Sequence, residues 1–313
     1  MSGIEITTPL HVRRRLRGRR LFEARILPAL FLLPAGLFVF GLTVWPVFRA
    51  FQLSFTDANL AMFTTGEFNY VGLNQYVSVF TSTFFRSVIL RTAVFGIACV
   101  ALTMTVGISV SLLLNRDFKG RTVLAILVIL PWAVPRVAAA IVWQWMFHDQ
   151  FGLMNWLLYS AGFELFRGFA WFNQPVIAFT AIAIVIVWQS FPFIAVSMLA
   201  GLQSIPGEIH DAAMIDGAGA WQRIMNITLP MLKSLVLVLT VISTIWAFKI
   251  FDQVFVMTAG GPARQTELLA ITTWREAFTQ HNFGRASALA MVMFFILAGI
   301  TAVYLRLIRE EEA

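Results

Sequence analysis

Six stretches of this chain are long and apolar enough to cross a lipid bilayer as helices. They cover residues 26–48, 92–115, 122–147, 175–202, 232–257 and 286–305. A hydrocarbon core about 30 Å thick requires roughly 20 helical residues, because each residue advances a helix by about 1.5 Å. Away from their ends, the only charged residues in these stretches are Arg136, Lys249 and Asp252. The pattern predicts an all-α membrane protein with six transmembrane helices.

Composition supports this fold class and narrows the partners. Hydrophobic residues make up 59% of the chain and charged residues 12%, about half the charged share of soluble domains. So large an apolar excess needs lipid to cover part of it. The formal net charge is +7. The basic residues follow the loops between the apolar stretches and form no single basic face, so nucleic acid is not an expected partner.

The distribution of Lys and Arg sets the expected orientation. Residues 1–25 form a basic arm with seven arginines, ahead of a membrane domain that is expected to cover 26–306. Placing this arm in the cytoplasm also places there the turn 115–121, the loop 203–231 and the tail 307–313. These segments with their immediate flanks hold fourteen of the 23 basic residues. By the positive-inside rule both termini are expected in the cytoplasm, and no cleaved signal peptide is expected because no cleavage site follows the basic arm.

The inner loop 203–231 carries the most informative local pattern. Ser204 is expected to cap a short helix, and Glu208 and Asp211 favour the positive N-terminal end of that helix. Gly217 should end it, and a second short helix should lead into the next span. The residues alone leave two interpretations open. The loop is either a helix–turn–helix element that docks into a groove of a partner protein or an amphipathic connector at the membrane surface.

The same loop resembles the coupling-loop signature of binding-protein-dependent ABC importer permeases. The signature is Asp-Ala-Ala, three residues, Gly, nine residues and Ile-x-Leu-Pro, and its positions here are Asp211, Ala212, Ala213, Gly217, Ile227, Leu229 and Pro230. The family usually has Glu at the first of these positions. Asp211 keeps the negative charge on a side chain that is one methylene shorter.

Further segments resemble the carbohydrate-uptake subgroup of these permeases. They are residues 68–76 (FNYVGLNQY), 112–116 (LLLNR), 130–135 (LPWAVP), 200–206 (AGLQSIP) and 251–262 (FDQVFVMTAGGP). The similarity covers nearly the whole chain. Within this subgroup, the chain resembles the first of the two paired permease subunits in transporters of the maltose and glycerol-phosphate type.

This resemblance implies a type I ABC importer transmembrane domain with a cytoplasmic coupling helix, in a bacterial inner membrane. Such a subunit works with a second permease subunit, two ATP-binding subunits and an extracytoplasmic solute-binding protein, and it translocates a sugar or sugar-like solute. The residues expected to couple it to an ATP-binding subunit are Glu208, Asp211, Ala212, Ala213, Asp216 and Gly217.

Sequence motifs for catalysis are missing from the chain. A phosphate-binding P-loop needs Gly-Lys-Ser/Thr, and none of the three lysines follows a glycine. The four histidines and the single cysteine, Cys99, form no spacing that predicts a metal site. We therefore expect a transport subunit that is not an enzyme and binds no cofactor or metal itself, with ATP and magnesium held by its partners.

Polar and aromatic residues inside two spans mark the expected solute pathway. Trp188 and Gln189 lie midway along the fourth span, and Trp246, Lys249 and Asp252 are spaced to share one face of the fifth. Plainer interpretations stay open. The tryptophans can fill helix interfaces, Gln189 can form an interhelical hydrogen bond, and Lys249 with Asp252 can form an ion pair within the helix.

The resemblance points to a similar set of pathway residues. It implicates positions that match Trp188, Gln189, Trp246 and Ile250. The charge of the solute stays open, because Arg136 and Lys249 suit an anionic sugar and the aromatic residues suit a neutral one.

Two other functions remain as alternatives. An ion- or proton-coupled carrier needs carboxylates within the membrane, and Asp252 is the single candidate within the spans. A membrane scaffold subunit that transports nothing is the other alternative.

Overall fold

The computed structural model describes residues 27–312, and the basic arm 1–25 lies outside the described residues. These residues form helices joined by turns and loops, with two isolated β-bridges and no longer strand in the described range. Five helices there are long and apolar enough to cross a membrane, and a sixth crossing results if one sharply bent pair counts as a span. The predicted all-α membrane fold is confirmed.

The chain divides into two compact units, of which the first ends at Leu53. Its described part is one apolar rod made of α2 (Leu27–Val39), the π-helix η2 (Phe40–Val44) and α3 (Trp45–Leu53). Phe31 and Phe38 expose 77% and 69% of their surface. A rod with apolar side chains all around it needs lipid or another membrane helix as its surroundings.

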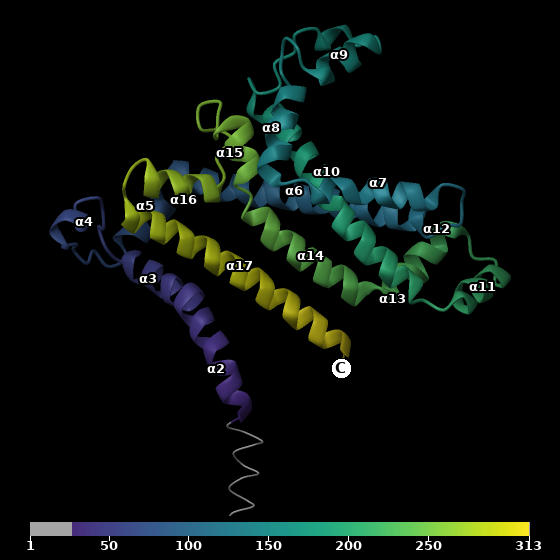
Figure 1. The fold of residues 1–313 in the computed structure, drawn as a ribbon, viewed down its shortest axis with the longest axis horizontal. Helices are drawn as coiled ribbons and strands as arrows, with labels where there is room; N and C mark the ends of the chain where they lie inside the picture. Colours follow the sequence, from purple (N-terminus) through teal and green to yellow (C-terminus); the bar gives the residue numbers. More distant parts are fainter. Residues whose placement is uncertain (1–26, 313) are drawn as a thin grey trace, which may run out of the picture. The chain divides into compact units, whose positions relative to one another are not determined.

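Four long helices form the body of the second unit (Figure 1): α6 (Thr83–Leu114), α10 (Pro175–Gln203), α14 (Lys233–Phe248) and α17 (Phe283–Glu312). Helices α6 and α10 approach closely at Gly107, where an added Cβ would lie 2.5 Å from the Cβ of Ile194. Small residues permit such close contacts between membrane helices. The last helix continues through the predicted tail as far as Glu312.

The predicted third span, 122–147, is not one straight helix. It consists of α7 (Arg121–Ala133) and α8 (Arg136–Met146), which meet at an angle of 99°. Pro135 has no backbone N–H to donate, and it forces the preceding Val134 into an extended conformation with ψ 131°. Figure 1 shows α8 turning away from α7 towards α15.

The predicted fifth span, 232–257, is interrupted as well. Helix α14 ends at Phe248, and α15 (Asp252–Thr258) starts after a break of three residues, Lys249–Phe251. Helices α8 and α15 lie beside each other, with the Gln144 side chain donating to the Met257 carbonyl at 3.3 Å. Two broken helices thus meet on one side of the long bundle.

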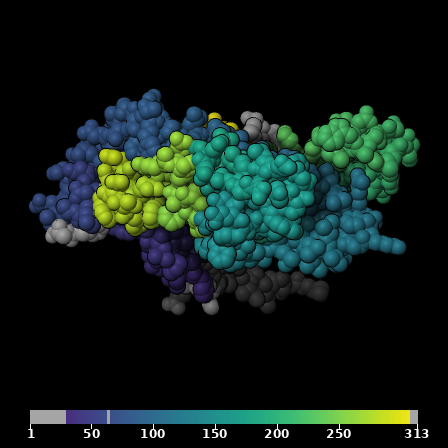
Figure 2. Space-filling model, turned by 90° about the horizontal axis from the view of Figure 1, so that it is seen from above, coloured from purple at the N-terminus to yellow at the C-terminus, as the bar shows by residue number. Residues whose placement is uncertain are grey.

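Short helices occupy the two opposite ends of the second unit (Figures 1 and 2). One end, the predicted outer side, has α4 (Met62–Thr65), α5 (Asn74–Thr81) and α16 (Leu269–Phe278). The predicted inner end has α11 (Gly207–Ile215), α12 (Ala220–Arg223), η4 (Ile224–Thr228) and α13 (Leu229–Met231). Helix α9 (Leu153–Ser160) and the 3-10 turn η3 (Glu164–Phe166) follow α8. In Figure 2 the green segment with α11 and α12 projects from the unit.

Candidate functional site

The predicted coupling loop folds into a helical knuckle around α11. Pro206 precedes the helix in an extended conformation, with ψ 132°, and no side chain caps it. The expected cap by Ser204 is wrong. The Ser204 hydroxyl donates to the Gly201 carbonyl at 2.7 Å, so it satisfies the end of α10 instead of the start of α11.

Gly217 ends α11 by a specific backbone arrangement. Its φ is +80°, in the left-handed region. The Gly217 N–H donates to the Met214 carbonyl at 3.1 Å, and the Ala218 N–H donates to the Ala213 carbonyl at 2.9 Å. This pair of bonds is the Schellman motif, which ends a helix with a left-handed residue, most often glycine. The chain therefore reverses sharply and enters α12.

The knuckle presents its candidate coupling residues to the surroundings. Glu208, Asp211, Ala212, Asp216 and Gly217 are exposed, whereas Ala213 is buried at 8% exposure. Apolar side chains are exposed beside them, with Ile215 at 87% and Trp221 at 68%. Exposed apolar residues grouped with acidic ones on a projecting helix are typical of a surface that binds a partner protein.

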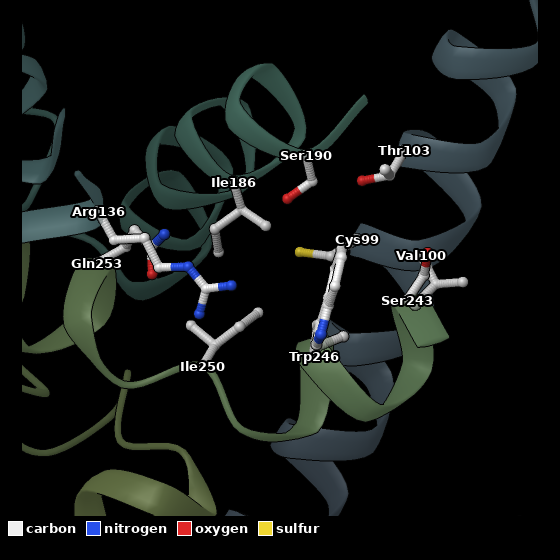
Figure 3. A pocket seen from close by; sticks show the side chains of 11 residues that line it. Cys99, Val100, Thr103, Arg136, Ile186, Ser190, Ser243, Trp246, Ile250 and Gln253 are labelled. Atoms are coloured by element: carbon white, nitrogen blue, oxygen red, sulfur yellow. The ribbon is translucent and has the colours of Figure 1, made fainter. Parts of the chain in front are cut away.

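The second candidate site is a cavity where α6, α10 and the two broken helices meet (Figure 3). Its polar lining is one guanidinium, three hydroxyls and one amide, from Arg136, Thr103, Ser190, Ser243 and Gln253. Its apolar lining comes from Trp246, Ile186, Ile250, Val100, Ala247 and Cys99. The cavity measures about 30 Å³, room for about two water molecules.

Gln189 links both helix breaks. Its side-chain amide donates to the Val134 carbonyl at 2.7 Å, beside Pro135. Its side-chain carbonyl accepts from the Gln253 amide at 2.9 Å, in the first turn of α15. Gln189 is buried at 5% exposure, so its polar atoms serve the packing of three helices. Among the interpretations above, the interhelical hydrogen bond is the one that the structure shows.

The other predicted pathway residues separate into two groups. Trp246 and Ile250 line the cavity. Trp188 does not, and its ring packs on that of Trp143 with centroids 5.4 Å apart. Lys249 is exposed in the break after α14 and Asp252 is half-buried at the start of α15.

The expected shared face and ion pair of Lys249 with Asp252 are wrong, because the helix stops at Phe248 and the described residues contain no ion pair between these two. The prediction failed because it assumed one continuous helix through Trp246, Lys249 and Asp252. Sequence reasoning noted Arg136 in the third span but missed Gln253 and the hydroxyl residues of the cavity. The sequence marked Arg136 as unusual, because it is a charged residue that follows a proline, Pro135, inside a predicted span.

The loop between α15 and α16, on the predicted outer side, is held by buried charge. Glu267 is fully buried, with Arg264 Nε at 2.8 Å and Arg275 Nε at 2.7 Å from its Oε1. The Arg264 contact is a hydrogen bond and the Arg275 contact is an ion pair without hydrogen-bond alignment. The hydrogen bond to Glu267 raises the pKa of Arg264. Nearby in α16, burial raises the pKa of Glu276, although Arg285 opposes the shift. We name Arg264, Glu267 and Arg275 the outer charge cluster.

Comparison with known proteins identifies the family. The sequence pattern of the family described as binding-protein-dependent transport system inner membrane component matches residues 103–309. The chain belongs to this family. It is an inner-membrane permease subunit of an ABC importer, and the resemblance of its sequence to these permeases is confirmed.

Relatives cover most of this permease. It is 37% identical over 286 residues to the diacetylchitobiose uptake system permease protein DasB of Streptomyces coelicolor, covering 91% of this chain and 87% of that one. It is 36% identical over 288 residues to the sulfoquinovosyl glycerol transport system permease protein SmoG of Agrobacterium fabrum, covering 92% of each chain. A crystal structure of a bacterial ABC transporter that imports alginate has a similar fold, with a TM-score of 0.79 at 21% identity over 94% of this chain and 99% of that one.

Proposed function

We propose that this permease carries a sugar or sugar-like solute across the bacterial inner membrane into the cytoplasm, driven by ATP hydrolysis on separate subunits. The observation that supports it most is the coupling knuckle. A family-type signature lies on a projecting helix whose acidic and apolar residues are exposed. The cargo class follows from DasB and SmoG, whose names refer to diacetylchitobiose and sulfoquinovosyl glycerol.

Coupling in this proposal is mechanical. Two ATP-binding subunits approach each other when ATP binds, and one of them holds α11 of this permease. The other holds the coupling helix of a second permease subunit. Movement of α11 shifts α10 and α14, the helices on either side of the knuckle, and thereby biases the pathway between inward-open and outward-open states. This connection is short, because α10 ends at Gln203, just before α11, and α13 ends at Met231, just before α14.

The cavity is consistent with a solute pathway between these states. It combines an aromatic side chain with hydroxyl and amide groups, and no carboxylate lines it. A proton- or sodium-driven carrier would need such a carboxylate. The present volume of about 30 Å³ corresponds to a state closed at this level. An extracytoplasmic solute-binding protein delivers the solute on the outer side, and both termini lie in the cytoplasm.

Substitution of Gly217 tests the coupling role. Gly217→Val places a β-branched residue at φ +80°, where a Cβ meets no neighbour within 4 Å, so the effect acts on the backbone alone. A left-handed conformation costs an L-residue about 1–2 kcal/mol, and solute-dependent ATP hydrolysis and uptake should fall by about tenfold. The measurement is uptake and ATPase activity of the complete transporter in proteoliposomes.

Gly219→Val is the matched control. Gly219 lies two residues away in the same loop with φ −64°, a conformation that valine adopts, and its nearest contact would be Gln222 Oε1 at 3.6 Å. This variant should keep uptake close to the unmodified level. Equal uptake by both variants and the unmodified protein would remove the coupling role of the Gly217 turn.

A further inference from the structure

Arg136 is an exposed charged residue within the third predicted span, and the described residues supply no partner for it. Helix α7 runs 13 residues from Arg121 before the break, which places Arg136 about 20 Å above the inner end, inside a hydrocarbon core about 30 Å thick. In the described part of the chain its guanidinium has no hydrogen bond and no ion pair. Such residues are costly in a membrane and mark functional sites.

The arginine points into the cavity. Figure 3 shows its side chain extending from the start of α8 into the space lined by Ile186, Ile250 and Trp246. It is the only charged side chain in the cavity lining, and hydroxyls of Thr103, Ser190 and Ser243 line the same space. Among the described residues that line the cavity, no carboxylate balances this positive charge.

Local backbone adds to that potential. Arg136 is the first residue of α8, an 11-residue helix. A cation is unfavourable at the positive end of the helix dipole, so helix stability does not explain why arginine stands there. An anion in the cavity would be attracted by both the guanidinium and the helix end.

We infer that the solute is an anionic saccharide and that Arg136 binds its acidic group while Trp246 and the hydroxyls bind the sugar. This inference rests on the proposed sugar cargo and adds the charge class. A guanidinium binds a carboxylate, sulfonate or phosphate through two parallel N–H donors. Arg136 is thus a specificity-determining residue for acidic over neutral sugars.

Binding of two matched sugars to the complete transporter in nanodiscs tests the inference. The probes are a glucose disaccharide and the same disaccharide with each C6 hydroxymethyl group oxidised to a carboxylate. The unmodified protein should bind the acidic probe about 10- to 100-fold more tightly, as charged hydrogen bonds predict. Arg136→Gln should abolish this preference and leave the affinity for the neutral probe unchanged, and Arg136→Lys should retain part of the preference.

Lys249→Gln is the control, since Lys249 is an exposed cation in the other helix break, after α14, and does not line the cavity. It should keep the preference. Equal binding of both probes to the unmodified protein overturns the inference and leaves the sugar cargo standing, as does an undiminished preference in Arg136→Gln. Assembly that fails in Arg136→Gln but not in Arg136→Lys also overturns it, because Arg136 then pairs with a partner subunit. Binding of neither probe overturns the cavity as a sugar site altogether.

Discussion

The predicted inner and outer ends of the second unit differ in how far each pairs its own charged groups. At the inner end, α11 exposes acidic side chains together with Ile215 and Trp221, and only Ala213 of the helix is buried. At the outer end, the loop after α15 encloses a fully buried Glu267 between arginines. The inner end exposes its acidic side chains, whereas the outer end buries its central carboxylate among arginines.

The outer loop is also tied to the long helices. Arg91 of α6 donates to the carbonyls of Arg264 and Gln265 at 3.1 and 2.6 Å. Thr92 accepts from the Leu269 N–H at 2.8 Å. By contrast, the α11 knuckle is held by its own backbone turn. We therefore expect the outer loop to move with α6 as one body. The position of the knuckle is expected to depend on the partner protein that binds it.

The largest expected effect comes from breaking the outer charge cluster. Glu267→Ala leaves Arg264 and Arg275 without their carboxylate, and removal of one partner from a buried ion pair destabilises by about 3 kcal/mol. The melting temperature of the purified protein should fall, and hydrogen exchange over residues 259–268 should accelerate. Glu164→Ala, at an exposed carboxylate, is the control. Unchanged exchange in Glu267→Ala would show that the outer loop is not held by this charge.

Gln189→Leu tests how strongly the two helix breaks are held together within the bundle. It leaves the Val134 carbonyl and the Gln253 amide without the partners that they have now. Interhelical hydrogen bonds in membranes are worth about 0.6–1.7 kcal/mol each, so we expect a loss of about 2 kcal/mol in thermal stability. Gln144→Leu, which removes one longer bond to Met257, should lose less. A larger loss from Gln144→Leu would contradict the assignment of Gln189 as the link between the two breaks.

Gly217→Ala should have a smaller, local effect at the inner end. Alanine at φ +80° strains the turn by about 1 kcal/mol. Hydrogen exchange of the Ala218 amide, which donates to Ala213 in the Schellman motif, should accelerate while the rest of the protein is unaffected. Gly219→Ala should leave this amide unchanged. A global loss of stability in Gly217→Ala would mean that the knuckle is not the independent element described above.

The smallest expected effect concerns pH at the outer end. Asn69 donates from its side chain and backbone N–H to the Asp57 carboxylate at 3.0 and 2.7 Å, and these bonds lower the pKa of Asp57. A lowered pKa stabilises the folded state above the ordinary aspartate value near 4. This contribution is lost as pH falls through the lower folded value. The difference in melting temperature between the unmodified protein and Asp57→Asn should therefore shrink towards pH 3, and a constant difference would contradict it.

The sequence by itself determined the membrane spans, through the length of the hydrophobic runs, and the α11 knuckle, through one local motif. Spans such as 92–115 and 286–305 are uncharged over the thickness of a membrane. The lipid bilayer is the environment that such long apolar helices require. The α11 knuckle was predictable because its turn is local. A glycine at a fixed distance after a short helix produces the Schellman motif wherever the helix lies.

The composition of the cavity lining was decided by tertiary structure. Trp246, Lys249 and Asp252 have the spacing of one helical face, but the break after Phe248 sends α15 in another direction and separates them. Gln253 and Arg136 are far apart in sequence and come together because α15 packs against α8 after two breaks. Helical periodicity extrapolates only along an unbroken helix. Where a proline or a helix end interrupts the backbone, packing between distant segments decides which side chains meet.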